Sequence, residues 1–322
     1  MFRSILLPLD GSVLAEAALP HAVALAEAFG APLLLLRVIP VRQRGGAAPL
    51  DIIDRRLGQA EAGAYLDALA SELRQRGLTV SAEVLEGHPA DRIVETVRTR
   101  DIDLVVLTTH GRGGENEFPI CGTAQKVVSR AQVSTCVVPT STGAHRLVGP
   151  DHTYRRVLVG LDGSRRGDWA IGPAATLARH AGAELLFVHV VQLPQMVAEP
   201  PSPAMLSAAE QLLALNRRAA VARLAETKAH HESADLRVRT RLEVAPEVAD
   251  VLADVAEAEQ ADLVVLAAHG SSASTRHSFG AVPMRVLGDV RRPVLVMQDL
   301  PRQHERPFAR HRAHRKTTFN HQ

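Results

Sequence analysis

A long internal repeat constrains the fold of this 322-residue chain more than any other feature. The run ILLPLDGS at residues 5–12 recurs as VLVGLDGS at residues 157–164, 152 positions later, and the alignment continues without a gap to residue 39. A second run, DLVVLTTHG at residues 103–111, recurs as DLVVLAAHG at residues 262–270. Repetition over this length indicates that a whole structural unit is duplicated.

The repeat divides the chain into two domains of ordinary size. We expect domain one at residues 1–140, a linker rich in Ser, Thr, Gly and Pro at 141–154, domain two at 155–299 and a basic tail at 300–322. A basic tail can contact nucleic acid or anionic lipid, but most such tails are only solvated, so we assign it no function.

Each copy alternates strand-like and helix-like segments. The first apolar run is typical of a strand buried on both faces, and the Ala-rich segment after it has a helical period. That helix ends at Gly30 or Gly182, and the next apolar run follows at once, which predicts a right-handed βαβ crossover. Later segments of copy one predict two helices and two strands, near residues 57–76, 91–100, 79–85 and 104–107. The expected fold class is α/β, with two tandem doubly wound, Rossmann-like parallel sheets.

Composition excludes several classes of protein. Aromatic residues make up 3% of the chain, which leaves little surface for stacking bases, so we do not expect a nucleic-acid partner. No apolar run reaches the roughly 18 residues that a membrane helix needs, and we expect no membrane contact. The first residues lack a signal-peptide pattern and the two cysteines, Cys121 and Cys136, are too few for a disulfide framework, which together predict a cytoplasmic protein.

The turn after the first strand is one candidate for a binding site, since ligands of open parallel sheets bind beyond the carboxyl ends of strands. It carries Asp10 and Ser12, with Asp162 and Ser164 in copy two. An Asp at this place can accept a hydrogen bond from a ribose hydroxyl or an adenine-side donor. It can equally cap the following helix, and position alone leaves both interpretations open.

The turn after the fourth strand is rich in glycine and leads into a helix expected at residues 124–130. Glycines let backbone amides approach an anion closely, and a helix start carries the positive end of the helix dipole. The segment is therefore a candidate phosphate cradle. Thr123 would add a hydroxyl donor there, although a residue that opens a helix can also act as a cap.

The Pro-Leu-Asp-Gly-Ser turn, followed by Thr-His-Gly and later by Gly-Thr, resembles the universal stress protein family. The resemblance covers nearly all of the chain except the linker and tail. It implies an adenine nucleotide, ATP with or without Mg²⁺, lying across the two turns of an adenine-nucleotide alpha-hydrolase-like fold. It also implies Asp10 or Asp162 near the base and ribose, and the backbone of the valine that ends the second strand beside the adenine. The candidate binding residues are Pro8, Leu9, Asp10, Val38, Thr108, His110, Gly111, Arg112, Gly122, Thr123, Ala124, Asp162, Val190, Gly270, Gly280 and Ala281.

Both copies depart from the glycine pattern of ATP-binding members, which is Gly, two residues, Gly, nine residues, Gly, then Ser or Thr. Thr108 and Ala267 stand in place of the first glycine, and copy one has a spacer of ten residues before Gly122. Copy two keeps the spacer of nine but has Ala281 in place of the hydroxyl residue. The lost hydrogen bond is worth about 1.5–3 kcal/mol when the acceptor is charged.

Copy one is therefore expected to bind nucleotide better than copy two. Against this stand Glu115 and Glu117, which place negative charge in the loop of copy one, where only Arg112 opposes them.

Neither His110 nor His269 stands with a Ser or Cys nucleophile, so we expect backbone hydrogen bonds to hold both and predict no catalytic residue. The pair His230 and His231 has no partner at ligand spacing, and we predict no metal site. A slow ATPase needs a group that positions water and a cation at the phosphates, and the loops offer no dedicated base or lysine. An enzyme is the weakest hypothesis.

Two other hypotheses stay open. The chain is a stress-response, ATP-binding module whose nucleotide-dependent conformation is recognised by an unidentified protein, or it is a nucleotide-free interaction scaffold of the same family, which the missing first glycine favours. Members of the family pair through their last strand, so we expect the edges at residues 135–138 and 294–297 to pair within the chain, and a homodimer could add to this assembly.

Overall fold

The computed structural model describes residues 2–40, 49–112, 120, 122–140, 154–194, 202–271 and 278–299, with the backbone alone for 49–52. The expected tail at 300–322, residues 141–153 of the expected linker, and Glu115, Glu117 and Cys121 lie outside these residues.

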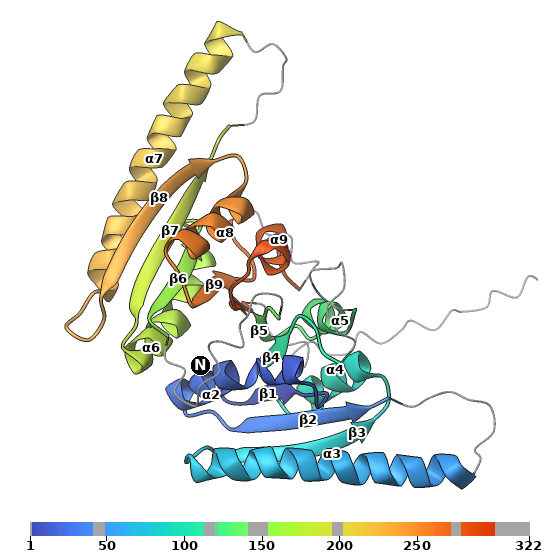
Figure 1. The fold of residues 1–322 in the computed structure, drawn as a ribbon. Helices are drawn as coiled ribbons and strands as arrows, with labels where there is room; N and C mark the ends of the chain where they lie inside the picture. Colours follow the sequence, from blue (N-terminus) through green and yellow to red (C-terminus); the bar gives the residue numbers. More distant parts are fainter. Residues whose placement is uncertain are drawn as a thin grey trace, which may run out of the picture.

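One continuous sheet of ten strands runs through both copies (Figure 1). Its strands are β1 (Ile5–Pro8), β2 (Leu33–Ile39), β3 (Val80–Glu86), β4 (Leu104–Thr108), β5 (Ser134–Val138), β6 (Arg156–Leu161), β7 (Glu184–Gln192), β8 (Val238–Ala245), β9 (Leu263–Ala267) and β10 (Val294–Met297). They lie in the order β3-β2-β1-β4-β5-β10-β9-β6-β7-β8, and every neighbouring pair is parallel except β5 and β10. The predicted α/β class and the parallel pairing within each copy are confirmed, and the β5–β10 pair joins the two expected sheets into one.

The helices follow the order expected from the repeat. They are α1 (Val13–Glu16), α2 (Leu19–Phe29), α3 (Pro49–Gln75), α4 (Pro89–Thr99), α5 (Gly122–Arg130), the 3₁₀ turn η2 (Gly167–Ala170), α6 (Ile171–Ala181), α7 (Pro203–His231), α8 (Val248–Ala258) and α9 (Ala281–Asp289). Gly30 and Gly182 end α2 and α6 at φ values of 60° and 65°, the left-handed conformation that glycine adopts without strain.

The helix expected directly after each first turn is broken in two. In copy one α1 ends before α2 begins, and Pro20 lies in the first turn of α2. Proline has no N–H to donate to the carbonyl four residues earlier, so a helix can begin at Pro20 but cannot run through it without losing a hydrogen bond. In copy two the segment is also divided, into the 3₁₀ turn η2 and α6, but these two follow each other without a gap.

A ladder between β5 and β10 joins the two copies, as the family resemblance implies, and the two strands run antiparallel. Val137 lies opposite Val294, and Cys136 lies opposite Leu295. Just beyond the ladder, the backbone N–H of Gln298 donates to Ser134 Oγ at 3.0 Å. Each copy therefore covers the last strand of the other, so neither last strand is a free sheet edge.

Each face of the sheet carries a core layer that crosses from one copy into the other. One layer includes buried residues of α2, α3, α6 and α7, and the other includes residues of α4, α5, α8 and α9. In the first layer Tyr154, the last residue of the expected linker, is 1% exposed, and its hydroxyl lies 2.8 Å from His21 Nδ1 of α2. A residue expected in the linker is thus part of the shared core.

We expect the two copies to unfold as one cooperative unit. Leu295→Ala would leave a cavity at the centre of the shared sheet, since Leu295 is 0% exposed, and should lower the free energy of unfolding by about 2–5 kcal/mol. Urea unfolding followed by circular dichroism should show one transition that shifts as a whole. Leu57→Ala on α3, where the side chain is 57% exposed, is the control and should change stability by less than about 0.5 kcal/mol. Two separate transitions, of which only one moves, would contradict the shared core.

Candidate functional site

Two cavities lie at the carboxyl ends of the parallel strands, one in each copy. The first has a volume of about 660 Å³ and is bounded by the turns after β1 and β4, by β2, and by α3, α4 and α5. The second has a volume of about 860 Å³ and is bounded by the equivalent turns of copy two together with α7, α8 and α9. Both volumes lie in the range of small-molecule sites, which is about 300–1,000 Å³.

The structure brings together the residues that the sequence singles out. All eleven candidates of copy one, from Pro8 to Ala124, line the first cavity. The candidates of copy two, which are Asp162, Val190, Gly270, Gly280 and Ala281, line the second. Their role in binding stays a prediction.

Asp10 ties the two turns of copy one together. Its Oδ1 accepts hydrogen bonds from Ser12 N at 2.9 Å and Ser12 Oγ at 2.6 Å, and its Oδ2 accepts from the backbone N–H of Arg112 at 2.5 Å. Ser12, rather than Asp10, is the N-cap of α1, and its Oγ accepts from Ala15 N. The capping interpretation of Asp10 is therefore replaced by a different structural role, a clasp between the turn after β1 and the turn after β4.

The same clasp recurs in copy two. Asp162 Oδ1 accepts from Ser164 N at 3.0 Å and from Ser164 Oγ at 2.7 Å, and Oδ2 accepts from Ser271 N at 2.6 Å. Ser164 Oγ in turn accepts from Gly167 N at 2.9 Å, at the start of η2. The clasp is therefore the feature of the site that both copies keep.

The clasp explains why a glycine follows each histidine. A Cβ built on Gly111 would lie far inside van der Waals contact of Asp10 Oδ2, and one built on Gly270 would collide in the same way with Asp162 Oδ2. Only a residue without a side chain lets the carboxylate come this close. These glycines are required by the protein's own carboxylates, whether or not a phosphate is bound.

Hydrogen bonding keeps both clasp carboxylates charged. Burial raises the pKa of Asp10, but the hydrogen bonds from Ser12 and from the amide of Arg112 together outweigh it, so the pKa lies below its ordinary 3.8. Burial likewise raises the pKa of Asp162, and the bonds from Ser164 and Ser271 bring it below 3.8.

Thr108 stands where ATP-binding members have the first glycine of their pattern. Its hydroxyl makes a hydrogen bond within the turn that follows β4. Thr108 Oγ1 donates to the carbonyl of His110 at 2.6 Å, and the side chain is 8% exposed. Its equivalent in copy two, Ala267, has no hydroxyl and also lines its cavity. The first glycine is thus replaced by a residue that stabilises the turn in one copy and by a small apolar residue in the other.

The two histidines are buried beside the cavities, and side chains hold them at Nδ1. His110 Nδ1 lies 3.1 Å from Thr109 Oγ1 and 3.2 Å from Thr140 Oγ1, while His269 Nδ1 lies 2.6 Å from Asp299 Oδ1. Thr140, which follows β5, and Asp299, which follows β10, thus hold the histidines through their side chains, and the sequence analysis did not anticipate these contacts.

Charged residues that the sequence analysis missed line the first cavity. They are Arg37 on β2, Glu61 on α3 and Lys126 on α5. The sequence analysis considered only the loops, and it therefore missed Lys126, which lies on α5 one turn after Gly122 and lines the first cavity. A signal for Arg37 was present in the repeat, which aligns it with His189.

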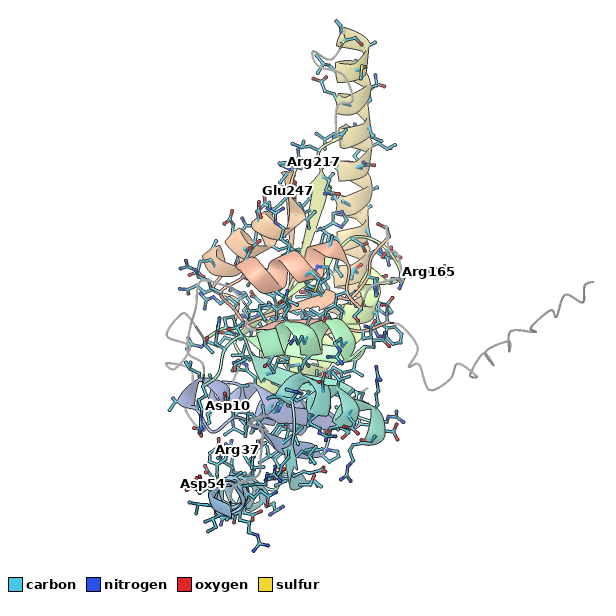
Figure 2. The ribbon with its side chains drawn as sticks, turned by 90° about the vertical axis from the view of Figure 1, so that its right-hand side faces the viewer. Asp10, Arg37, Asp54, Arg165, Arg217 and Glu247 are labelled. Atoms are coloured by element: carbon cyan, nitrogen blue, oxygen red, sulfur yellow. The ribbon has the colours of Figure 1, made fainter. Side chains whose placement is uncertain are left out.

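Arg37 is oriented by α3. Its guanidinium lies 5.3 Å from the centre of the Tyr65 ring, and Tyr65 Oη donates to Glu16 Oε1 at 2.7 Å. In Figure 2, Arg37 lies between Asp10 and α3, and a Cβ built on Gly11 would lie 3.0 Å from its guanidinium. Arg37 therefore lies beside the turn after β1, and its guanidinium contacts the Tyr65 ring.

The second cavity carries less positive charge among its described lining residues. His189 replaces Arg37, and burial lowers the pKa of its imidazole, although Asp162 opposes the shift. Arg223 of α7 is the arginine of this lining, and it pairs with Asp168 of η2. An anionic ligand would meet fewer available cations here than in copy one.

Comparison with known proteins gives the same architecture. The Universal stress protein family matches residues 1–139 and 153–298. The chain belongs to the universal stress protein family. It is 30% identical to a universal stress protein of Mycobacterium bovis over 228 residues, which cover 69% of this chain and 70% of that protein. It is 26% identical to one of Mycolicibacterium smegmatis over 91% of this chain and 96% of that protein.

A solved universal stress protein from Archaeoglobus fulgidus has the same fold, with a TM-score of 0.60 and 17% identity over 92% of this chain and 96% of that chain. A solved protein from Pseudomonas aeruginosa superposes with a TM-score of 0.62 and 16% identity, over 92% of each chain.

Within the described residues, no three His, Cys, Asp or Glu side chains are grouped closely enough to hold a metal ion. None of the described helices combines the length and the apolar character needed to cross a membrane.

Gly111→Ala should break the clasp of copy one. The added methyl group displaces Asp10 or the turn, so the N–H of Arg112 loses its acceptor and the free energy of unfolding falls by about 1–3 kcal/mol. Gly63→Ala on α3 is the matched control, because a Cβ there meets nothing within 4 Å, and it should stabilise the helix by up to about 1 kcal/mol. Equal stability of the two variants in thermal unfolding would disprove the clasp.

The clasp also predicts how stability depends on pH. Because the folded pKa of Asp10 lies below the unfolded value, its contribution is complete above about pH 4 and is lost as the pH falls through the folded pKa. Urea unfolding from neutral pH to about pH 3 should show a steeper loss of stability for the wild type than for Asp10→Asn. Asp54→Asn, at an exposed carboxylate of α3, should follow the wild type. Parallel curves for the wild type and Asp10→Asn would contradict the assignment.

Proposed function

We propose that this universal stress protein is an adenine-nucleotide-binding module that takes ATP in the cavity of copy one. Its nucleotide-dependent conformation is then recognised by another protein. The main support for the proposal is that the two turns joined by Asp10 and the N-terminus of α5 all line the same cavity. Backbone amides at a helix start and in a glycine turn are suited to phosphate.

The polar groups of the first cavity match the parts of a nucleotide. Arg37, Arg112 and Lys126 provide positive charge for phosphates, and Thr123 lies in the first turn of α5 with a hydroxyl to donate. Asp10 Oδ2 accepts one hydrogen bond from the protein, so it keeps a lone pair for a hydroxyl or amino donor of the ligand. The apolar part of the lining, which includes Leu36 and Val38, suits the face of a base.

Copy two should bind the same ligand more weakly. It has an alanine at 281 where copy one has the Thr123 hydroxyl, and the positive charge of Arg37 is replaced by His189. Loss of one hydrogen bond to a charged group is worth about 1.5–3 kcal/mol, or roughly a tenfold to hundredfold weaker affinity.

A nucleotide-free scaffold is the second candidate, and one observation favours it. Ser12 and Arg112 already bind both oxygens of Asp10, so the clasp is complete without a ligand. In that case the site residues serve stability alone. We propose no catalytic step for either candidate.

Calorimetric titration of the full chain with ATP and Mg²⁺ tests the proposal. We expect micromolar binding with one site, lost in Asp10→Ala and kept in Asp162→Ala. These two variants are matched, because each removes an equivalent clasp and should destabilise the fold equally, as thermal unfolding would verify. Lys126→Ala should weaken binding by about tenfold with no loss of stability. If the folded wild type does not bind ATP, the proposal is wrong and the nucleotide-free scaffold is favoured.

A further inference from the structure

Helix α7 extends beyond the domain that it packs on. The buried side chains of α7 are Ala220, Leu224 and Thr227, all in its C-terminal part. Figure 1 shows the N-terminal half standing clear of the sheet, and Figure 2 shows the same projection from the side. About half of a 29-residue helix is thus in contact with little of its own chain.

The projecting half of α7 carries more large apolar side chains than a helix surrounded by water usually does. Leu206, Leu212 and Leu215 are 45%, 48% and 64% exposed, and Glu210, Arg217 and Arg218 are its charged residues between positions 203 and 219. A helix surrounded by water usually carries charged residues around its circumference. Leu212 and Leu215, six and nine positions after Leu206, lie on the far side of the helix from it, so the exposed leucines form two separate apolar faces. An exposed apolar face can serve as an interaction site.

The equivalent helix α3 differs at the same place. It also exposes two large apolar side chains, Ile53 and Leu57, but Asp54, Arg55 and Arg56 lie between them. Projection of a long helix is common to both copies, and charged residues are denser in the projecting part of α3 than in that of α7.

One face of α7 has a pattern with two-fold symmetry. We define the α7 stripe by residues that share this face at helical spacing: Leu206, Glu210, Leu213, Ala214, Arg217 and Val221. Five of them, from Glu210 to Val221, border a shallow groove with a volume of about 560 Å³. The stripe is centred between Leu213 and Ala214, with an acid and a base at equal distances on opposite sides of this centre, and an apolar residue at equal distances farther out.

We propose that two copies of this chain associate through their α7 stripes, antiparallel and around a two-fold axis between Leu213 and Ala214. In that arrangement Glu210 of each copy faces Arg217 of the other, and Leu206 faces Val221. Glu210 and Arg217 are seven positions apart, about 10.5 Å along the axis, so both ion pairs form at once when the helices run in opposite directions.

Charge selects a second copy over other partners. The stripe is complementary to itself, since the same surface carries both members of each ion pair, as a two-fold interface requires. Within the residues that the structure describes, neither Glu210 nor Arg217 has an ion-pair partner of its own. Such an interface closes at two copies, and it is separate from the β5–β10 ladder that joins the domains.

Sedimentation of the full-length protein over a concentration series tests the proposal. The wild type should convert from monomer to dimer as concentration rises. Glu210→Arg and Arg217→Glu should each raise the dissociation constant by about tenfold or more, because like charges then face each other, and the double variant should return it to near the wild-type value. Leu206→Asp should weaken the dimer, whereas Leu57→Asp on α3, at a leucine that is 57% exposed against 45% for Leu206, should leave it unchanged.

All of these substituted side chains are exposed, so the variants should fold, and circular dichroism verifies this. A protein that stays monomeric up to ~100 μM would overturn the proposal. So would a dimer that Glu210→Arg and Leu206→Asp do not weaken, since the interface would then lie elsewhere. Failure of the double variant to restore a dimer that both single variants weaken would rule out the antiparallel pairing.

Discussion

The antiparallel ladder between β5 and β10 is the contact on which the rest of the molecule depends. Each copy alone would end in a short, fully buried apolar strand with unpaired backbone groups at its edge. Pairing the two edges makes one sheet and lets both core layers continue across the junction. Because strands are parallel within a copy and antiparallel across the ladder, the two sets of carboxyl ends point in opposite directions. The two cavities are therefore separate sites.

Within each copy, the clasp aspartate joins two turns, as the β5–β10 ladder joins the two copies. Asp10 and Asp162 connect turns that are about a hundred residues apart in the chain, and each requires a glycine at the point of contact. The clasp is the same in both copies, but the lining around it has diverged, as Arg37 and His189 show. Duplication thus kept the frame of the site and changed the groups that a ligand would meet.

The long helices show a second divergence. Both α3 and α7 extend beyond their strands, so part of each helix is stabilised by something other than packing on the sheet. Both parts carry large apolar residues. Charged residues are denser in α3, which has Asp51, Asp54, Arg55 and Arg56 between positions 49 and 57, than in α7, which has Glu210, Arg217 and Arg218 between positions 203 and 219.

The sequence alone determined the duplication, the parallel sheets, the helix ends at Gly30 and Gly182 and the contents of the two turns, because apolar period and glycine conformation are local properties. The tertiary structure alone decided which groups meet: the amide of Arg112 at Asp10, Lys126 at the cavity, and Tyr154 in the core beside His21. These contacts join residues far apart in the chain. Their geometry depends on the twist and register of the whole sheet, which no local pattern encodes.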